Sequence, residues 1–255
     1  MTEATSPLGT LEWVAATGGR LTTAEVRQLL RPLAAAHAAN VVGRLAMVVR
    51  LNAGRHADID VDGLQPPTSP LTALAEREAR SRLSPTLLNH SYRTYAFGVA
   101  LGALADIDVD HELLFAAAML HDVGLGRSVQ GVDFTLASAA VARDVAKTVG
   151  LSAAATETIR SAITLHYSPG VSLAHGPVAY LLSAGAGVDV AGLRSWALPP
   201  QVLADVVAKR PRLGFKREFR AAFRAEAAAV PRGRARLLRR YGAFDLAIAC
   251  APFRG

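Results

Sequence analysis

Several residue types are scarce in this 255-residue sequence, and each scarcity narrows the class of protein. Cys250 is its single cysteine, which excludes an intramolecular disulfide and favours a reducing compartment. Aromatic residues make up 6% of the chain and charged residues 19%, while 51% of the residues are hydrophobic. Much of this apolar content is alanine and leucine, which favour helix over sheet. The composition therefore predicts an all-α protein with a large core.

Long hydrophobic runs are also missing. The most apolar windows, residues 96–105 and 178–190, are too short to span a bilayer or are interrupted by Asp189. Residues 1–5 do not begin the basic and then apolar pattern of a secretory signal. We therefore expect a cytoplasmic protein that does not enter a membrane.

The net charge of +7 is unevenly distributed along the chain. Residues 209–240 contain 12 Lys or Arg against Glu218 and Glu226, which gives this segment +10 and leaves −3 for the rest. So many cations could bind a nucleic acid or an acidic partner. Phenylalanine recurs every four residues from Phe215 to Phe223, however, which is more typical of a helix docked by its aromatic face with a solvated basic face. We therefore expect a small-molecule partner rather than a nucleic acid.

No linker in the sequence is long enough to separate two domains. We expect one body in three parts. Residues 1–70 form an N-terminal helical extension and a loop, residues 71–200 form the domain with the functional site, and residues 201–255 form basic helices packed on the same body. Residues 1–20 indicate a partly ordered lead-in, and the long N-terminal helical region could pair with a second copy to give a homodimer.

Cap residues, glycines and prolines indicate where helices begin and end. Pro32 lies inside the first long apolar stretch, so a helix either kinks or begins anew there. The predicted helices cover residues 22–51, 85–104, 110–122, 135–149, 152–166, 177–191, 200–209, 215–224 and 235–251.

Four of these helices carry polar side chains where the pattern predicts the core. His90, His166 and Asp189 each lie three or four residues from apolar residues of their own helix, which places them on the buried stripe. His121 and Asp122 follow one another at the end of an apolar helix. We therefore expect these five side chains to point into the interior.

Such groups need partners when they are buried. A buried polar group without a partner costs roughly 2 to 7 kcal/mol, and an unpaired charge costs more. A single histidine on an apolar face is more often a hydrogen-bonded core residue than a ligand, and a single aspartate is more often a helix cap. Groups from four helices together favour contact with one another or with a shared divalent cation.

The order His90, then His121-Asp122, then Asp189 on separate helices resembles the HD-domain superfamily of all-α metal-dependent hydrolases. The resemblance covers about residues 80–195. It implies an HD-domain helical bundle in which these four residues bind a divalent metal ion: zinc, iron or manganese.

Three stretches are most similar to the cyanamide hydratase branch of that superfamily. They are Asn89-His90-Ser91-Tyr92-Arg93-Thr94-Tyr95-Ala96-Phe97-Gly98, Leu120-His121-Asp122-Val123-Gly124 and Asp189-Val190-Ala191-Gly192. This resemblance implies a hydratase or hydrolase that acts on a small neutral molecule such as the nitrile-like compound cyanamide.

The ligand set predicts how such an enzyme would work. Two imidazoles and two carboxylates leave positions on the metal free for water, whose pKa the metal lowers. Asp122 could bind the metal through one oxygen and orient the water through the other. His166 is a candidate second-shell group, proton donor or ligand of a second metal. Arg93, one turn after His90, could bind an anion or a polar substrate, or could equally form a surface salt bridge.

The alternative function is an HD-type phosphohydrolase that acts on a nucleotide or another phosphoester. A phosphate substrate calls for several Arg or Lys side chains near the site. The motif helices offer mainly Arg93, and the loop after His121-Asp122 offers Arg127. This scarcity of cations favours the small neutral substrate.

Overall fold

The computed structural model describes residues 6–59 and 62–254, and within these ranges it contains α-helices, short 3-10 turns and no β-strand. The all-α prediction is confirmed. No helix in the described ranges is long and apolar enough to cross a bilayer. The helices are α1 (Leu11–Thr17), α2 (Thr23–Val48), α3 (Pro70–Arg82), α4 (Pro85–Leu104), α5 (His111–Leu120), α6 (Phe134–Thr148), α7 (Ala153–Leu165), α8 (Pro177–Ala191), α9 (Pro200–Lys209), α10 (Phe215–Ala229), α11 (Arg234–Tyr241) and α12 (Phe244–Ala249).

The helices that carry the predicted site residues begin where their cap residues indicate. The hydroxyl of Ser84 accepts a hydrogen bond from the backbone N–H of Leu87, and Pro85 occupies the first turn of α4, where a missing N–H costs nothing. The carboxylate of Asp110 caps α5, and the hydroxyl of Ser152 caps α7. These predicted starts are confirmed.

The N-terminal region is more ordered than the sequence-based expectation of a lead-in. Thr10 caps α1, which packs into the core through the buried side chains of Trp13 and Val14. Residues 1–5 of the expected lead-in lie outside the described residues. The long helix α2 continues through Pro32 and does not begin anew there.

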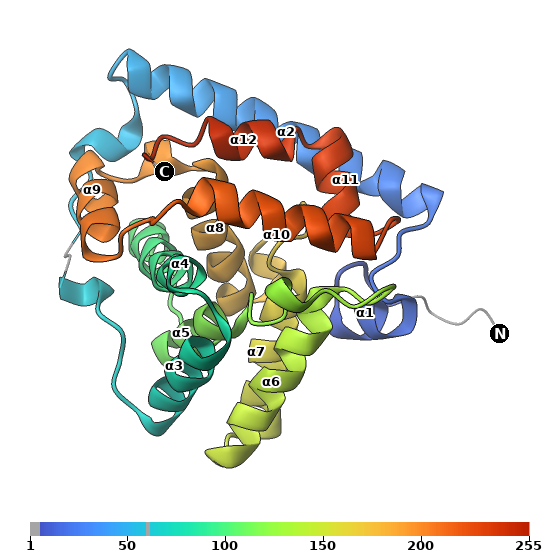
Figure 1. The fold of residues 1–255 in the computed structure, drawn as a ribbon. Coiled ribbons are helices and arrows are strands. Elements are labelled where there is room, and N and C mark those ends of the chain that lie inside the picture. Colours follow the sequence, from blue (N-terminus) through green and yellow to red (C-terminus); the bar gives the residue numbers. More distant parts are fainter. Residues whose placement is uncertain (1–5, 60–61, 255) are drawn as a thin grey trace.

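Two helices differ from the expected boundaries. Residues 70–82, for which no helix was expected, form α3 behind a cap at Ser69. The single helix expected over residues 235–251 is wrong, because α11 and α12 are separate. Ala243 between them has a φ of 44°, and an α-helix cannot continue through this left-handed conformation. The break gives α12 a direction of its own (Figure 1).

The close packing of α4 against α8 brings two predicted ligands together. Gly185 on α8 faces the backbone of α4, and a Cβ atom there would lie 2.1 Å from the carbonyl oxygen of Thr94. Thr94 is one turn after His90, and Gly185 is one turn before Asp189. The glycine therefore allows the approach that places these two side chains in contact.

A second hydrophobic cluster joins the two ends of the chain. Trp13 of α1, Leu33 of α2 and Phe219 of α10 belong to this cluster, which is separate from the main core around α4, α5 and α8. The backbone N–H of Leu21 also donates to the carbonyl of Arg232 over 2.8 Å. As Figure 1 shows, α2 and α10 to α12 lie together on one side of the α3 to α8 bundle. The terminal segments thus cover the helices that carry the site.

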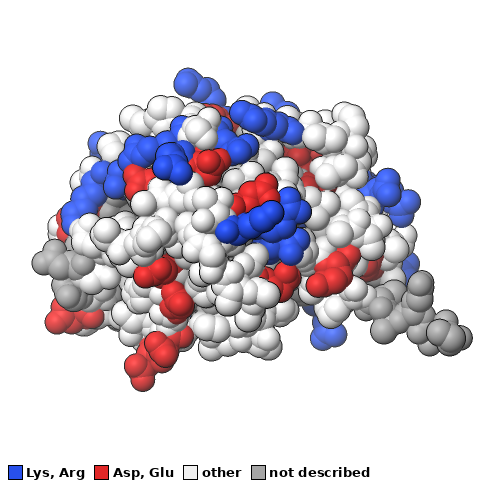
Figure 2. Space-filling view, turned by 90° about the horizontal axis from the view of Figure 1, so that it is seen from below, with Lys and Arg blue, Asp and Glu red and all other residues white. Residues whose placement is uncertain are grey.

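Basic and acidic side chains occur together on the surface of the protein. On the face shown in Figure 2, Lys and Arg are interspersed with Asp and Glu and separated by uncharged residues. Asp245, for example, pairs with both Arg220 and Arg239. Part of the positive charge of residues 209–240 is therefore neutralised within the protein.

Candidate metal centre

Four helices deliver the predicted site residues to one buried place. His90 lies in the second turn of α4, and Asp189 lies in the last turn of α8. His121 and Asp122 directly follow α5, and His166 directly follows α7. All five residues are at most 6% exposed. The inward orientation expected from the helical periodicity is confirmed for each of them.

Each of the three imidazoles has its Nδ1 atom fixed by an acceptor. His121 and His166 donate from Nδ1 to the backbone carbonyl three residues earlier, each over 2.7 Å. His90 donates from Nδ1 to Oδ2 of Asp189, also over 2.7 Å. Because these acceptors are carbonyl or carboxylate oxygens, Nδ1 carries the hydrogen in each ring. The Nε2 atom of each neutral imidazole is left with a free lone pair.

These Nε2 atoms converge on the carboxylate of Asp122. His90 Nε2 lies 3.3 Å from His121 Nε2, and Asp122 Oδ2 lies 3.2 Å from His121 Nε2 and 3.6 Å from His90 Nε2. His166 Nε2 is 3.7 Å from Oδ1 of Asp122. Two nitrogen lone pairs that face each other repel unless a proton or a cation lies between them. The arrangement therefore concentrates electron-pair donors around one point.

The donor set fits a divalent metal ion. Oδ2 of Asp122 is buried and has no hydrogen-bond partner among the described residues, which is costly for a carboxylate without a cation. His90, His121 and Asp122 each offer one ligand atom, and these atoms lie within 4.8 Å of one another. Imidazole and carboxylate groups together suit zinc, iron or manganese.

Burial and neighbouring charges set the protonation of this cluster. Burial works to raise the pKa of Asp122, but His121, His90 and His166 around it together outweigh burial and hold that pKa well below its usual range. Burial works to lower the pKa of His121, but Asp122 and the other acceptors around it outweigh burial and raise that pKa. Burial, and then the nearby His121, lower the pKa of His166 to about 3. Burial also lowers the pKa of His90. At neutral pH, Asp122 is thus ionised and His166 offers a neutral Nε2 acceptor.

Asp189 lies behind His90, where two arginines bind it. Its Oδ1 accepts a hydrogen bond from Nε of Arg93 over 2.8 Å and another from Arg212, and its Oδ2 accepts from Nη2 of Arg93 over 2.8 Å. Burial works to raise the pKa of Asp189, but Arg93 outweighs it and the pKa is lowered. In this arrangement Asp189 fixes the orientation of His90, and its part as a direct metal ligand stays a prediction.

Arg93 is fully buried, so the surface salt bridge considered for it is excluded. Its Nη1 donates to the backbone carbonyls of Arg210 and Pro211 over 2.9 and 3.2 Å, while the rest of the guanidinium binds Asp189. Arg93 therefore connects α4 and α8 to the chain that leads into α10. Its predicted role toward a substrate stays a prediction.

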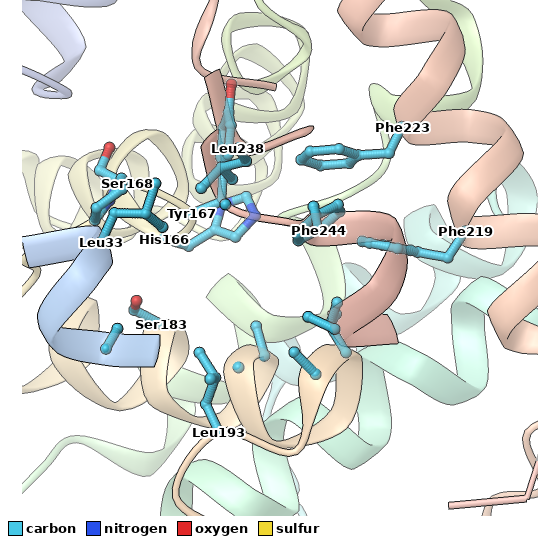
Figure 3. Close-up of a pocket in the computed structure, with 18 of the residues that line it drawn as sticks. Leu33, His166, Tyr167, Ser168, Ser183, Leu193, Phe219, Phe223, Leu238 and Phe244 are labelled. Carbon is cyan, nitrogen blue, oxygen red and sulfur yellow. The ribbon is translucent and has the colours of Figure 1, made fainter. Parts of the chain in front are cut away.

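A cavity of about 160 Å³ opens beside the cluster. His90, His121, Asp122 and His166 are among the residues that line it. The other walls are largely apolar, as Figure 3 shows. Of the described residues that line the cavity, none is Lys or Arg. The wall residues include Leu33, Leu193, Phe219, Phe223, Leu238 and Phe244.

Sequence reasoning did not identify two buried arginines of the basic segment. Arg212 and Arg234 are 3% and 0% exposed, although the surrounding cations indicate a solvated face. Arg212 neutralises Asp189, and Arg234 binds the buried carboxylate of Asp133 over 2.9 Å. A buried arginine could have been predicted from Asp189, since a buried carboxylate requires a counter-charge. The sequence does not say which of the many arginines supplies it.

Arg234 also holds the end of α7, from which His166 projects. Its Nη1 donates to the carbonyl of Thr164 over 2.6 Å and to the hydroxyl of Ser168 over 2.7 Å. Tyr167 donates its hydroxyl to Asp133, the partner of Arg234. A residue from the C-terminal segment thus fixes the backbone on both sides of His166.

Comparison with known proteins agrees with this geometry. Residues 87–185 match the family model of the HD domain. The matched region contains His90, His121, Asp122 and His166 and ends four residues before Asp189. No curated protein matches the chain. The match supports assignment of residues 87–185 to the HD-domain superfamily, whose members are generally metal-dependent hydrolases.

Proposed function

We propose that this protein is a metal-dependent hydrolase or hydratase that directs an activated water at a small uncharged molecule, and that a nitrile-like compound such as cyanamide represents its substrates. The observation that carries the proposal is the meeting of three imidazole Nε2 atoms at the carboxylate of Asp122, whose Oδ2 has no hydrogen-bond partner among the described residues, beside a cavity. The HD-domain match supports the reaction class.

In this proposal His90, His121 and Asp122 hold a divalent ion, with Asp189 as the predicted fourth ligand or as the group that orients His90. A bound divalent ion supplies Lewis-acid activation of water and of the electrophile. The hydrogen bonds from the Nδ1 atoms keep the imidazoles in the tautomer and orientation that ligation needs.

The protein groups then position the water and handle its protons. Asp122 accepts a hydrogen bond from the water through one oxygen, and neutral His166 can accept a second one at Nε2. In nitrile hydration the water oxygen bonds to the nitrile carbon, and one carbon–nitrogen π bond breaks to give an imidic acid. Its tautomerisation replaces the second carbon–nitrogen π bond by a carbon–oxygen π bond, so both water hydrogens end on the nitrogen. The product is an amide, and the reaction needs no oxidant or reductant.

The charges around the cavity argue against a phosphoester substrate. Recognition of phosphate calls for Arg or Lys side chains that reach the ligand. Arg93 and Arg212 are both bound to Asp189, and Arg234 is bound to Asp133. The buried cations nearest the site are therefore held by carboxylates of the protein, with Arg93 and Arg212 sharing one carboxylate and Nε and Nη2 of Arg212 left without a partner among the described residues.

The test combines metal analysis with a substrate panel. Purified protein is analysed for zinc, iron and manganese, and then assayed with cyanamide, small nitriles, nucleotides and generic phosphoesters. We expect about one equivalent of metal and turnover of an uncharged substrate, both lost in His121→Ala. Nucleotide turnover lost in the same variant would establish the phosphohydrolase instead. Absence of metal and of turnover after reconstitution with each ion would refute the enzyme.

A further inference from the structure

Much of the cavity wall comes from parts of the chain outside the HD-domain match. Leu33 belongs to α2, Phe219 and Phe223 to α10, and Phe244 to α12, whereas the match covers residues 87–185. In Figure 3 the three phenylalanines face Leu33 across the cavity. Selection among substrates would therefore depend in part on segments that lie outside the matched region.

These walls offer little that a polar or charged ligand could bind. Tyr167 and Ser168 line the cavity; the Tyr167 hydroxyl donates to Asp133, and the Ser168 hydroxyl accepts from Arg234. His37 and Ser183 add the polar atoms that remain outside the metal centre. A ligand would thus meet polar groups mainly at the end near the histidines and would meet aromatic or aliphatic carbon elsewhere. Such a site favours a molecule with one polar end and an apolar body.

The volume of the cavity is also too large for cyanamide. An apolar cavity of roughly 150 Å³ is sufficient to hold benzene, and the cavity here measures about 160 Å³. Cyanamide has only about half as many non-hydrogen atoms as benzene and no apolar part. It would leave much of the aromatic wall without contact, and unfilled apolar space forgoes dispersion and hydrophobic stabilisation of the complex.

We infer that the substrate is an uncharged molecule with an apolar body of about the size of a benzene ring, of the class of aryl or branched alkyl nitriles, and that it is preferred over cyanamide. This inference rests on the proposed function for the reaction at the polar end. The apolar body lies between Leu33 and the aromatic side chains of α10 and α12. The reacting carbon points to the cluster formed by His90, His121 and Asp122.

Direct binding tests the ligand class without requiring turnover. The full-length protein, with its metal removed by a chelator so that the ion cannot itself bind the anions, is titrated with 4-fluorobenzonitrile, 4-fluorobenzoate and 4-fluorophenyl phosphate, and binding is followed by fluorine NMR. We expect the nitrile to bind at least about tenfold more tightly than either anion, because the walls supply no cation. Tighter binding of either anion, or no binding of the nitrile, overturns the inference.

Turnover separates this inference from the proposed function. Benzonitrile hydration with a kcat/KM above that of cyanamide supports both. Cyanamide turnover without benzonitrile binding contradicts the substrate class and keeps the proposed function. Binding of the nitrile to a protein that holds no metal and hydrates neither compound contradicts the proposed function and, with it, the assignment of this ligand as a substrate.

A matched pair of variants locates the bound probe. Ala36 and Ala39 are both exposed residues of α2, but only Ala36 is among the cavity-lining residues of the described chain. In Ala36→Phe the added ring competes for the cavity, so we expect the nitrile to bind at least about fivefold more weakly. Ala39→Phe should bind it like the unmodified protein. Equal affinities in the two variants would place the probe elsewhere and overturn the inference, and circular dichroism checks that both variants fold.

Discussion

Asp122 is the residue on which the proposed centre depends most directly. One oxygen faces His121 and His90, and the other faces His166, while Oδ2 lacks a hydrogen-bond donor within the described chain. Burying a carboxylate oxygen that has no hydrogen-bond donor costs free energy, and a bound cation removes this cost. Replacing Asp122 should therefore reduce metal retention more than it reduces the free energy of unfolding.

Asp122→Asn should weaken metal binding by at least about 100-fold, because the amide removes the negative charge among the donors. Elemental analysis after dialysis against a dilute chelator measures the retained metal. Asp144→Asn is the control, since Asp144 is exposed and pairs only with exposed Arg143. Full retention of metal by Asp122→Asn would remove this residue from the ligand set.

Asp189→Asn should reduce the free energy of unfolding by about 3 to 5 kcal/mol, because it leaves Arg93 and Arg212 buried without their counter-charge. Denaturant titration measures the change. Asp245→Asn offers a comparison at a partly exposed ion pair, where about 1 kcal/mol or less is expected. Similar losses in the two variants would show that the buried cluster contributes no more than a surface pair.

At the scale of elements, the start of α6 and the end of α7 are held by the C-terminal segment. Asp133 caps α6 and binds Arg234 of α11, while Glu226 of α10 accepts a hydrogen bond from the backbone N–H of Phe134 over 3.1 Å. The hydroxyl of Ser128 donates to the same carboxyl group over 2.9 Å. Asp133 and Glu226 are thus both buried near the start of α6, and Arg234 compensates mainly the charge of Asp133.

Glu226 should make the stability depend on pH. Burial, and then the carboxylate of Asp133, raise its pKa from 4.5 to about 7. Between these values the folded protein keeps a proton that the unfolded chain has released. The free energy of unfolding therefore falls as the pH rises through this window, by roughly 3 kcal/mol at most.

Glu226→Gln should remove this fall, since the amide stays uncharged at every pH. Urea titrations at pH 5, 6 and 7 on the variant and the unmodified protein compare the two slopes. We expect the variant to lose less stability than the parent as the pH rises to about 7. Parallel curves would mean that the pKa of Glu226 is not raised in the folded state.

At the scale of the whole molecule, the division into a site domain with two extensions stays a prediction. The packing indicates that the three parts depend on one another for stability. Arg212 and Arg234 lie beyond residue 200, yet they neutralise Asp189 and Asp133 within residues 71–200. The aromatic side chains of α10 also cover His90, whose ring centre lies 4.9 Å from that of Phe215.

A fragment of residues 71–200 should therefore not fold cooperatively by itself. Asp133 would lose Arg234, Asp189 would keep only Arg93 of its two arginines, and the faces under α2 and α10 would meet water. Circular dichroism and thermal unfolding of the fragment, compared with the full chain, measure this. A sharp unfolding transition of the isolated fragment would show that residues 201–255 are a separable addition.

Local signals were sufficient to predict much of the helical framework. The caps at Ser84, Asp110 and Ser152 lie at helix starts because a hydroxyl or carboxylate bonds the first free N–H groups whatever the fold around it. The inward orientation of His90 and His166 followed from periodicity. The break at Ala243 was not predicted, because no local pattern favours positive φ at an alanine.

The sequence by itself determined the helical class, the order of the histidine and aspartate residues and their position on buried faces, since these depend on contacts a few residues apart. Only the tertiary structure decided which charges meet. Arg212 pairs with Asp189 across 23 residues, and Arg234 pairs with Asp133 across 101. Many arginines satisfy the same electrostatic need, and the choice among them depends on how the terminal helices pack over the site. That packing also forms the apolar cavity beside the proposed metal centre. Helical periodicity alone does not predict this cavity.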